Sequence, residues 1–222
     1  DMVLPEDYQP FNIVEVRFKG SQKKFFKNVK NLDLYTGDKV IVDSDIGYDV
    51  GEVSLSGELV KLQLKKYGVD ENNAEMRTIR SVANEFETKK YQEFKGIEQK
   101  TLEQARTIAL QLRLQMKISD IEFQGDGKRV TFYYTSEGRV DFRELIRRYA
   151  AEFKARIQMM QVSYREEASR LGGIGSCGRE LCCSTWLTDY KVVSMSAPKV
   201  QNLSINMLKL SGQCGRLKCC LN

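Results

Sequence analysis

The sequence predicts an α+β protein with a small N-terminal antiparallel β-barrel, an α+β sandwich, and a cysteine-rich, metal-organised C-terminal region. Short apolar runs between Gly–Asp turns, a mixed helix and strand periodicity, and the confinement of all six cysteines to the C-terminal part predict this class. We expect four segments: 1–68 for the barrel, 69–97 for a linker and charged helix, 98–165 for the sandwich, and 166–222 for the cysteine-rich region.

The N-terminal segment reads as a series of short strands. Apolar and polar residues alternate from Phe11 to Lys19, and turns at 36–38 and 45–49 precede strands at 39–42 and 51–55. Strands at this spacing, bounded by Gly and Asp, are typical of a small antiparallel barrel. Such a barrel serves either as a docking module or as a nucleic-acid reader, and the residues leave both open.

A polar stretch at 67–75 predicts an exposed loop, and a highly charged helix is expected from Ile79 to Phe94. A second helix is expected to start at Thr101, because Gln104 stands at the capping-box position. The apolar residues that follow have helical spacing and are expected to face the core: Leu102, Ala105, Ile108, Ala109, Leu112 and Met116.

The sandwich is predicted from the elements that follow this helix. A hairpin is expected from the runs 118–123 and 129–135, which Gly125-Asp126-Gly127 joins. Asp141 is expected to cap the next helix, with Glu144 in the capping-box position, and a strand is expected at 155–162. The order helix, strand, strand, helix, strand places the helices on one face of a small sheet.

Composition excludes several classes of function. The 222 residues contain no histidine, which removes Ser–His and Cys–His catalytic pairs and every histidine-containing metal site. No run approaches the ~18 apolar residues of a membrane span, and Asp1 to Phe11 lacks a signal pattern. We therefore expect no membrane insertion.

The net charge of +5 is concentrated near the cysteines, since residues 171–222 contain six basic and two acidic residues. Two interpretations are open. The cations offset the negative charge of a thiolate site, in which four thiolates around Zn²⁺ leave a charge of −2. Alternatively, they form a surface with weak affinity for RNA.

One motif occurs twice. Gly-Ser-Cys-Gly-Arg-Glu-Leu-Cys-Cys spans 175–183 and Gly-Gln-Cys-Gly-Arg-Leu-Lys-Cys-Cys spans 212–220. Structural disulfides are disfavoured, because neighbouring cysteines bridge only with strain and no secretory signal is present. Redox catalysis would need a Cys-x-x-Cys motif or an activating base, and the sequence contains neither. A thiol enzyme that uses Cys183 or Cys220 is a third hypothesis. Thiolates are the ligands of zinc and of iron–sulfur clusters, so metal binding is the favoured interpretation.

Adjacent side chains point apart, so the simplest site takes two ligands from each copy. These are Cys177 with Cys182 and Cys214 with Cys219. Cys183 and Cys220 are left over, and they either ligate a second centre completed by another protein or are buried as small apolar residues.

Four residues separate the first cysteine of each copy from the cysteine pair. Zinc sites favour two to four residues between ligands, often two, and plant-type ferredoxins use a gap of four, so the spacing does not decide between zinc and an iron–sulfur cluster. Glycines in the loops tilt the choice slightly toward a cluster, because they let backbone N–H groups approach its sulfides. The supporting residues are Gly175, Gly178, Arg179, Gly212, Gly215 and Arg216.

The chain resembles the bacterial YaaT/RicT family, which shares a C-terminal domain named for a yeast polymerase-suppressor protein. The resemblance is carried by the residues at 138–145, 171–183, 201–206 and 210–221, with further similarity at 37–40 and 47–51. It departs from the family pattern at 162–167, where Ser163 replaces a usual glycine, and at 194–198.

The resemblance implies a cytoplasmic, non-enzymatic regulator. Members of the family assemble with two small partner proteins into an iron–sulfur complex that acts with the endoribonuclease RNase Y in mRNA processing. By motif, Cys177, Cys182, Cys214 and Cys219 would hold a [4Fe–4S] cluster, and Cys183 would face a second cluster shared with partners. The expected function is thus an iron–sulfur-binding regulatory adaptor, and the alternative is a zinc-stabilised RNA-binding module.

Overall fold

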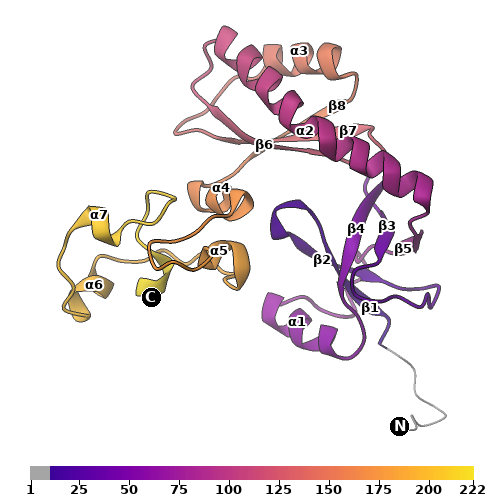
Figure 1. Cartoon of the computed structure of the whole chain (residues 1–222), viewed down its shortest axis with the longest axis horizontal. Coiled ribbons are helices and arrows are strands. Elements are labelled where there is room, and N and C mark those ends of the chain that lie inside the picture. The colour runs from indigo at the N-terminus through magenta and orange to yellow at the C-terminus, as the bar shows by residue number, and fades with distance from the viewer. Residues whose placement is uncertain (1–10) are drawn as a thin grey trace. The chain divides into compact units, whose positions relative to one another are not determined.

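The computed structural model describes residues 11–222 and divides the chain into two compact units (Figure 1). Among the described residues, the first unit comprises 11–18, 22–94 and 124–126, and the second comprises 19–21, 95–123 and 127–222. The expectation that the N-terminal residues lack a signal pattern falls almost entirely outside the described range.

The first unit contains a five-stranded antiparallel sheet in the order β2-β1-β4-β3-β5. Its strands are β1 (Ile13–Arg17), β2 (Lys23–Lys27), β3 (Lys39–Asp43), β4 (Tyr48–Leu55) and β5 (Ile79–Val82). Apolar residues on one face form a buried cluster that includes Val14, Val16, Val40, Val42 and Ile79. The period-2 alternation of the sequence places these side chains together on one face of the sheet.

The structure does not show a closed barrel, because the sheet stays open along most of its length. Its two edge strands approach each other only at a single parallel bridge between Lys27 and Thr78, where the Lys27 amide donates to the Arg77 carbonyl at 2.8 Å. β5 is only four residues long, so it does not extend this bridge into a ladder that would close the sheet.

Two helical assignments in this part of the chain also needed correction. Residues 59–67 were expected among the strands, but they form helix α1 (Leu59–Tyr67), whose buried Val60 and Leu64 pack with Ile13. The charged helix was expected to begin at Ile79, but Ile79 begins strand β5, and the helix starts at Glu85.

Helix α2 (Glu85–Gln111) is one continuous helix, so the predicted break at Thr101 is wrong. Thr101 lies inside it and donates its hydroxyl to the carbonyl of Ile97 at 2.9 Å, a local bond that satisfies the side chain without ending the helix. The capping box is at the true start: Asn84 accepts from the Glu87 amide at 2.8 Å, and Glu87 accepts from the Asn84 amide at 3.0 Å.

The second unit confirms the predicted order of helix, strand, strand, helix, strand. The sheet has the order β6-β7-β8, with β6 (Lys117–Phe123) antiparallel and β8 (Arg156–Gln161) parallel to the central β7 (Arg129–Thr135). Helices α2 and α3 (Arg143–Phe153) lie on the same side of this sheet (Figure 1).

Aromatic packing joins the helices to the sheet. Tyr149 of α3 is fully buried, and its ring stacks on that of Phe132 with centroids 4.5 Å apart. The Tyr149 hydroxyl donates to the carbonyl of Ala105 in α2 at 2.7 Å. The N-terminus of α3 differs from expectation: Phe142 occupies the cap position without a side-chain bond.

Asp141 still contacts this helix terminus, because its carboxylate accepts from the Arg143 amide at 3.1 Å and pairs with the Arg143 side chain. Glu144 does not complete a capping box with it. Its carboxylate instead bonds to Arg148 one turn further on, at 3.4 Å.

The C-terminal region is made of short helices and turns. They are α4 (Tyr164–Leu171), α5 (Cys182–Thr185), α6 (Ser196–Val200), α7 (Met207–Leu210) and the 3₁₀ turn η2 (Cys219–Leu221); a further 3₁₀ turn of this unit, η1, is Lys19–Ser21. A small buried apolar cluster of Val193, Leu210 and Leu221 lies among them. The expected organisation of this region by a metal is not shown by the structure.

Candidate metal centre

Each copy of the cysteine motif folds into the same backbone turn. The amide of Gly175 donates to the Arg179 carbonyl at 2.7 Å, and that of Gly212 donates to the Arg216 carbonyl at 2.8 Å. In both turns the residue after the first cysteine is a glycine with positive φ, +77° in the first and +72° in the second. The repeat in sequence is therefore also a repeat in three-dimensional structure.

A short helical turn follows in each copy, and it begins at Cys182 and Cys219 respectively. The preceding residues, Leu181 and Lys218, have matching extended dihedral angles (φ −59°, ψ 130° and φ −56°, ψ 133°). Cys182 and Cys219 therefore follow equivalent backbone conformations in the two copies.

The glycines that open the turns leave room for sulfur. A Cβ atom placed on Gly175 would lie 3.3 Å from Sγ of Cys177, and one placed on Gly212 would lie 3.7 Å from Sγ of Cys214. The guanidinium groups of the predicted support residues Arg179 and Arg216 lie on exposed side chains, and the turns use only their backbone carbonyls.

The two turns face one cavity of about 220 Å³, and all six cysteines line it. Its other walls come from Ala168 on α4 and from loop residues that include Leu181 and Leu217. The structure thus brings both copies to a common space, as the sequence analysis required. All six cysteines are free thiols, with Cys183 buried and Cys177 and Cys220 exposed.

Electrostatics reveal which thiols lie close together across the two copies. Burial raises the pKa of Cys183, and the neighbouring thiols of Cys219, Cys214 and Cys182 raise it further. Burial likewise raises the pKa of Cys219, and the nearby cation of Arg165 partly offsets this rise. A soft metal must therefore displace protons from these sulfurs when it binds.

The donor set fits a thiolate-bound metal, because soft sulfur ligands from two loops converge where no other strong ligand type predominates. Among residues 11–222, however, no group of three or more Cys, Asp, Glu or His side chains is arranged to hold a metal ion. Ligation would therefore require the thiol side chains to rotate inward from the positions that the structure shows.

Helix α4 links the two copies to each other. Arg165 donates to the carbonyls of Lys191 (2.9 Å) and Leu217 (3.1 Å), the latter in the second copy. Ser169 donates to the carbonyl of Cys183 in the first copy. The sequence did not predict a role for these residues. In the structure, Arg165, Glu167 and Ser169 are all buried, which is unusual for three polar residues of one short helix.

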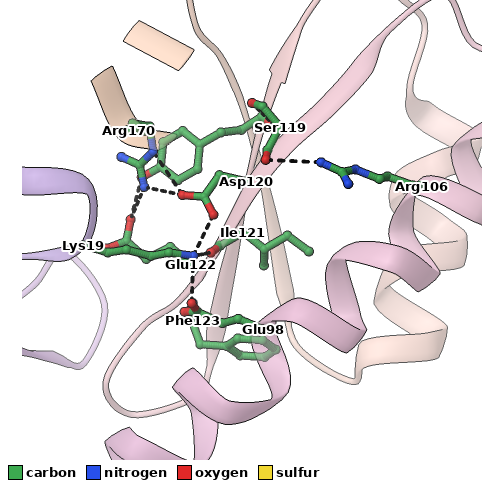
Figure 2. Close-up of polar contacts among 10 residues, drawn as sticks. Lys19, Glu98, Arg106, Ser119, Asp120, Ile121, Glu122, Phe123 and Arg170 are labelled. Atoms are coloured by element: carbon green, nitrogen blue, oxygen red, sulfur yellow. Dashed lines mark hydrogen bonds and ion pairs between the residues drawn. The ribbon is translucent and has the colours of Figure 1, made fainter. Parts of the chain in front are cut away.

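The same helix is also tied to strand β6 by a buried ion network (Figure 2). Arg170 bonds to Asp120 at 3.1 Å and to Glu122 at 3.2 Å, and its guanidinium lies 3.6 Å from the centroid of the Tyr133 ring. Tyr133 donates its hydroxyl to Glu122 at 2.7 Å. Since Arg170 is near the end of α4, this network fixes the start of the first cysteine loop.

Lys19 extends the network (Figure 2). Its ammonium lies 2.6 Å from Asp120 and 2.7 Å from Glu98 of α2, and it donates to the Ile121 carbonyl at 2.6 Å. Burial lowers the pKa of Lys19, but the bonds to Asp120 and Glu98 outweigh it and leave the pKa raised. Burial raises the pKa of Glu98 despite the same contact.

Two conserved family regions match the chain. The PSP1 C-terminal conserved region matches residues 77–162, and the third domain of PSP1-like proteins matches residues 192–222, which contain the second cysteine copy. The stage 0 sporulation protein YaaT of Bacillus subtilis is 38% identical over 204 residues, which cover 91% of this chain and 71% of that protein. The chain belongs to the YaaT/PSP1 family.

Two yeast proteins are similar in sequence to parts of the chain. The uncharacterized protein PB7E8.02 of Schizosaccharomyces pombe is 33% identical over 177 residues, or 69% of this chain and 23% of that protein. Protein PSP1 of Saccharomyces cerevisiae is 44% identical over 50 residues, or 22% of this chain and 6% of that protein. No solved structure matches the chain. Among the described helices, none combines the length and apolar character needed to cross a bilayer.

Proposed function

We propose that this YaaT/PSP1-family chain is a non-enzymatic regulatory adaptor that binds an iron–sulfur cluster through its duplicated cysteine loops. The stage 0 sporulation role named for the Bacillus subtilis relative supports a regulatory function. The observation that carries the proposal is the single cavity lined by all six cysteines.

In the proposed site, Cys177, Cys182, Cys214 and Cys219 hold a [4Fe–4S] cluster, with two ligands from each equivalent turn. Cys183 and Cys220, at the third cysteine position of each copy, would serve a second cluster shared with a partner; Cys220 is exposed, whereas Cys183 is buried and would first have to become accessible. When bound, the cluster supplies a cross-link between the two loops that is sensitive to oxygen and to iron supply.

The residues of the chain itself determine what such a cross-link controls. The loops contain little apolar core besides the cluster of Val193, Leu210 and Leu221. Their fold is held by α4 through backbone carbonyls, and ligation would add to that hold. The surface of 172–222 would then be ordered for partners when the centre is loaded, and looser when it is empty.

The partners implied by the family resemblance are two small proteins and an RNase Y-type endoribonuclease, which place the function in mRNA processing. The absence of histidine and the use of the buried carboxylates of α2 and β6 in ion pairs support a non-enzymatic role. A cytoplasmic location, which the family resemblance implies, is part of the same proposal.

Anaerobic purification followed by metal and sulfide analysis tests the proposal. We expect iron and acid-labile sulfide, with visible absorbance from thiolate–iron charge transfer, and their loss in Cys182→Ser and Cys219→Ser. Ser176→Ala, which alters a neighbouring side chain of the same cavity, serves as the matched control and should keep the iron. Protein that contains zinc alone under these conditions would favour the alternative cofactor.

A zinc-stabilised RNA-binding module is the second candidate, and one observation favours it. Residues 190–222 contain five basic residues and no acidic residue. Phosphate contacts produce a steep fall of affinity with salt, so RNA binding measured across a salt series distinguishes the two functions. An RNA affinity with a steep salt dependence in zinc-loaded protein would support this candidate, and negligible binding would exclude it.

A further inference from the structure

Arg165 is the buried charge in the wall of the cysteine cavity. Three charged residues line the cavity, namely Arg165, Glu180 and Lys218, and only Arg165 is buried, with 5% of its surface exposed. A guanidinium is rarely buried without anionic or hydrogen-bonding partners, because it loses its hydration. Its contacts therefore indicate what this position is for.

Two of the three nitrogens of Arg165 have partners, and both partners are backbone carbonyls. Nη1 donates to Lys191 and Nη2 donates to Leu217, which are 26 and 52 residues away in the chain. These two bonds hold the second cysteine copy and the segment before α6 against α4. Carbonyls carry no net charge, so neither bond neutralises the cation.

The third nitrogen, Nε, is buried and has no hydrogen-bond partner among the described residues. An unpaired N–H in a buried position is unfavourable, so an acceptor is expected there when the site is complete. Arg165 acts electrostatically on the thiol of Cys219, which lines the same cavity. The unpaired N–H thus belongs to a residue that lines the same cavity as the thiols.

We propose that Arg165 is a positioning residue of the thiolate centre: its cation offsets the negative charge of the loaded site, and its Nε–H donates to a ligand sulfur. This inference rests on the proposed function. Four thiolates around Zn²⁺ leave two negative charges, and the same thiolates around a cluster of charge +2 leave two as well. A fixed, buried cation stabilises such a centre more than the exposed arginines of the turns do, because water screens exposed charges.

The test measures Co²⁺ affinity of the reduced full-length protein by the thiolate charge-transfer absorbance, in competition with a chelator. We compare Arg165→Gln and Arg165→Lys with Arg147→Gln, whose side chain is 81% exposed on α3. Loss of a group that supports metal ligands reduces affinity about 10- to 100-fold, and we expect this range for Arg165→Gln. Arg165→Lys should keep most of the affinity, because it keeps the charge.

The lysine variant separates a charge effect from a structural one. Glutamine and lysine each retain a donor for one of the two carbonyls, so a purely structural clamp would make the two variants equally weak. That result, or an Arg165→Gln affinity equal to that of Arg147→Gln, would overturn the proposal. Thermal unfolding of the metal-free variants reports separately on folding.

The reduction potential of the reconstituted cluster gives a second readout, since a nearby cation favours the reduced, more negative state. We expect a lower potential in Arg165→Gln than in the wild type, and an unchanged potential would contradict the charge assignment. If the wild type bound neither Co²⁺ nor a cluster, the proposed function would fall and the role of Arg165 with it. Equal binding by wild type and Arg165→Gln would overturn the role of Arg165 alone.

Discussion

Replacing Arg170 tests whether the buried ion network holds helix α4 in place. The side chain is 5% exposed, and the carboxylates of Asp120 and Glu122 that it contacts are 11% and 19% exposed. Removal of one partner from a buried ion pair costs about 3–5 kcal/mol, because the remaining charge is left uncompensated. Lys19 still contacts Asp120, so we expect Arg170→Ala to be near the lower end, about 3 kcal/mol.

The assay is urea unfolding of the reduced protein, followed by far-ultraviolet circular dichroism and by fluorescence. Trp186 is the sole tryptophan and belongs to the second unit, so its fluorescence reports on the unit that contains the network. The control is Arg17→Ala, because Arg17 pairs with Glu52 on the surface, with side chains 52% and 41% exposed. We expect a loss of less than about 1 kcal/mol for the control. An Arg170→Ala loss no larger than that of the control would refute the reasoning.

Three further outcomes are expected. Burial raises the pKa of the Tyr149 hydroxyl, so above about pH 10 the unfolded chain releases this proton while the folded chain keeps it. The free energy of unfolding therefore falls as pH rises, by up to about 1.4 kcal/mol per pH unit. Urea titrations at several pH values should show a shallower fall for Tyr149→Phe. Gly215→Ala should destabilise the second turn by about 1–2 kcal/mol because of its positive φ, whereas Gly215→Asn should cost less in the same unfolding assay. Chelation of the proposed metal should accelerate tryptic cleavage after Arg179 and Arg216 as seen by mass spectrometry, and equal cleavage with and without metal would contradict a metal-stabilised loop.

The sequence predicted those elements whose signal is local and repeated. The hairpin of β6 and β7, helix α3 and strand β8 follow from period and turn residues alone, and they occur in the predicted order. The equivalence of the two cysteine turns was visible in the spacing of Gly, Cys and Arg. Confinement of all thiols to two copies of one motif also anticipated their meeting at one cavity.

Errors arose where two local signals competed. Thr101 and Gln104 have capping-box spacing, but Asn84 and Glu87 have it too, and only the second pair lies at a helix start. Ile79 belongs to a short edge strand because it pairs with Val42, a partner distant in sequence. Closure of the sheet depends on the lengths of its edge strands, which a local pattern does not specify.

The role of helix α4 could not be predicted from the sequence, for a different reason. A sequence such as Tyr-Arg-Glu-Glu-Ala-Ser-Arg-Leu reads as a solvated helix, because charged residues are usually exposed. Arg165 is buried because it meets backbone carbonyls that lie 26 and 52 residues further along the chain. Only the folded structure shows that these carbonyls converge on it.

The third cysteine of each copy has a different environment, although the motifs match: Cys183 is buried and Cys220 is exposed. An alkylating reagent added to the native, metal-free protein should therefore modify Cys220 before Cys183. The third cysteines of the duplicated motif therefore differ in accessibility, and of these two a partner that approaches from solvent can contact only Cys220.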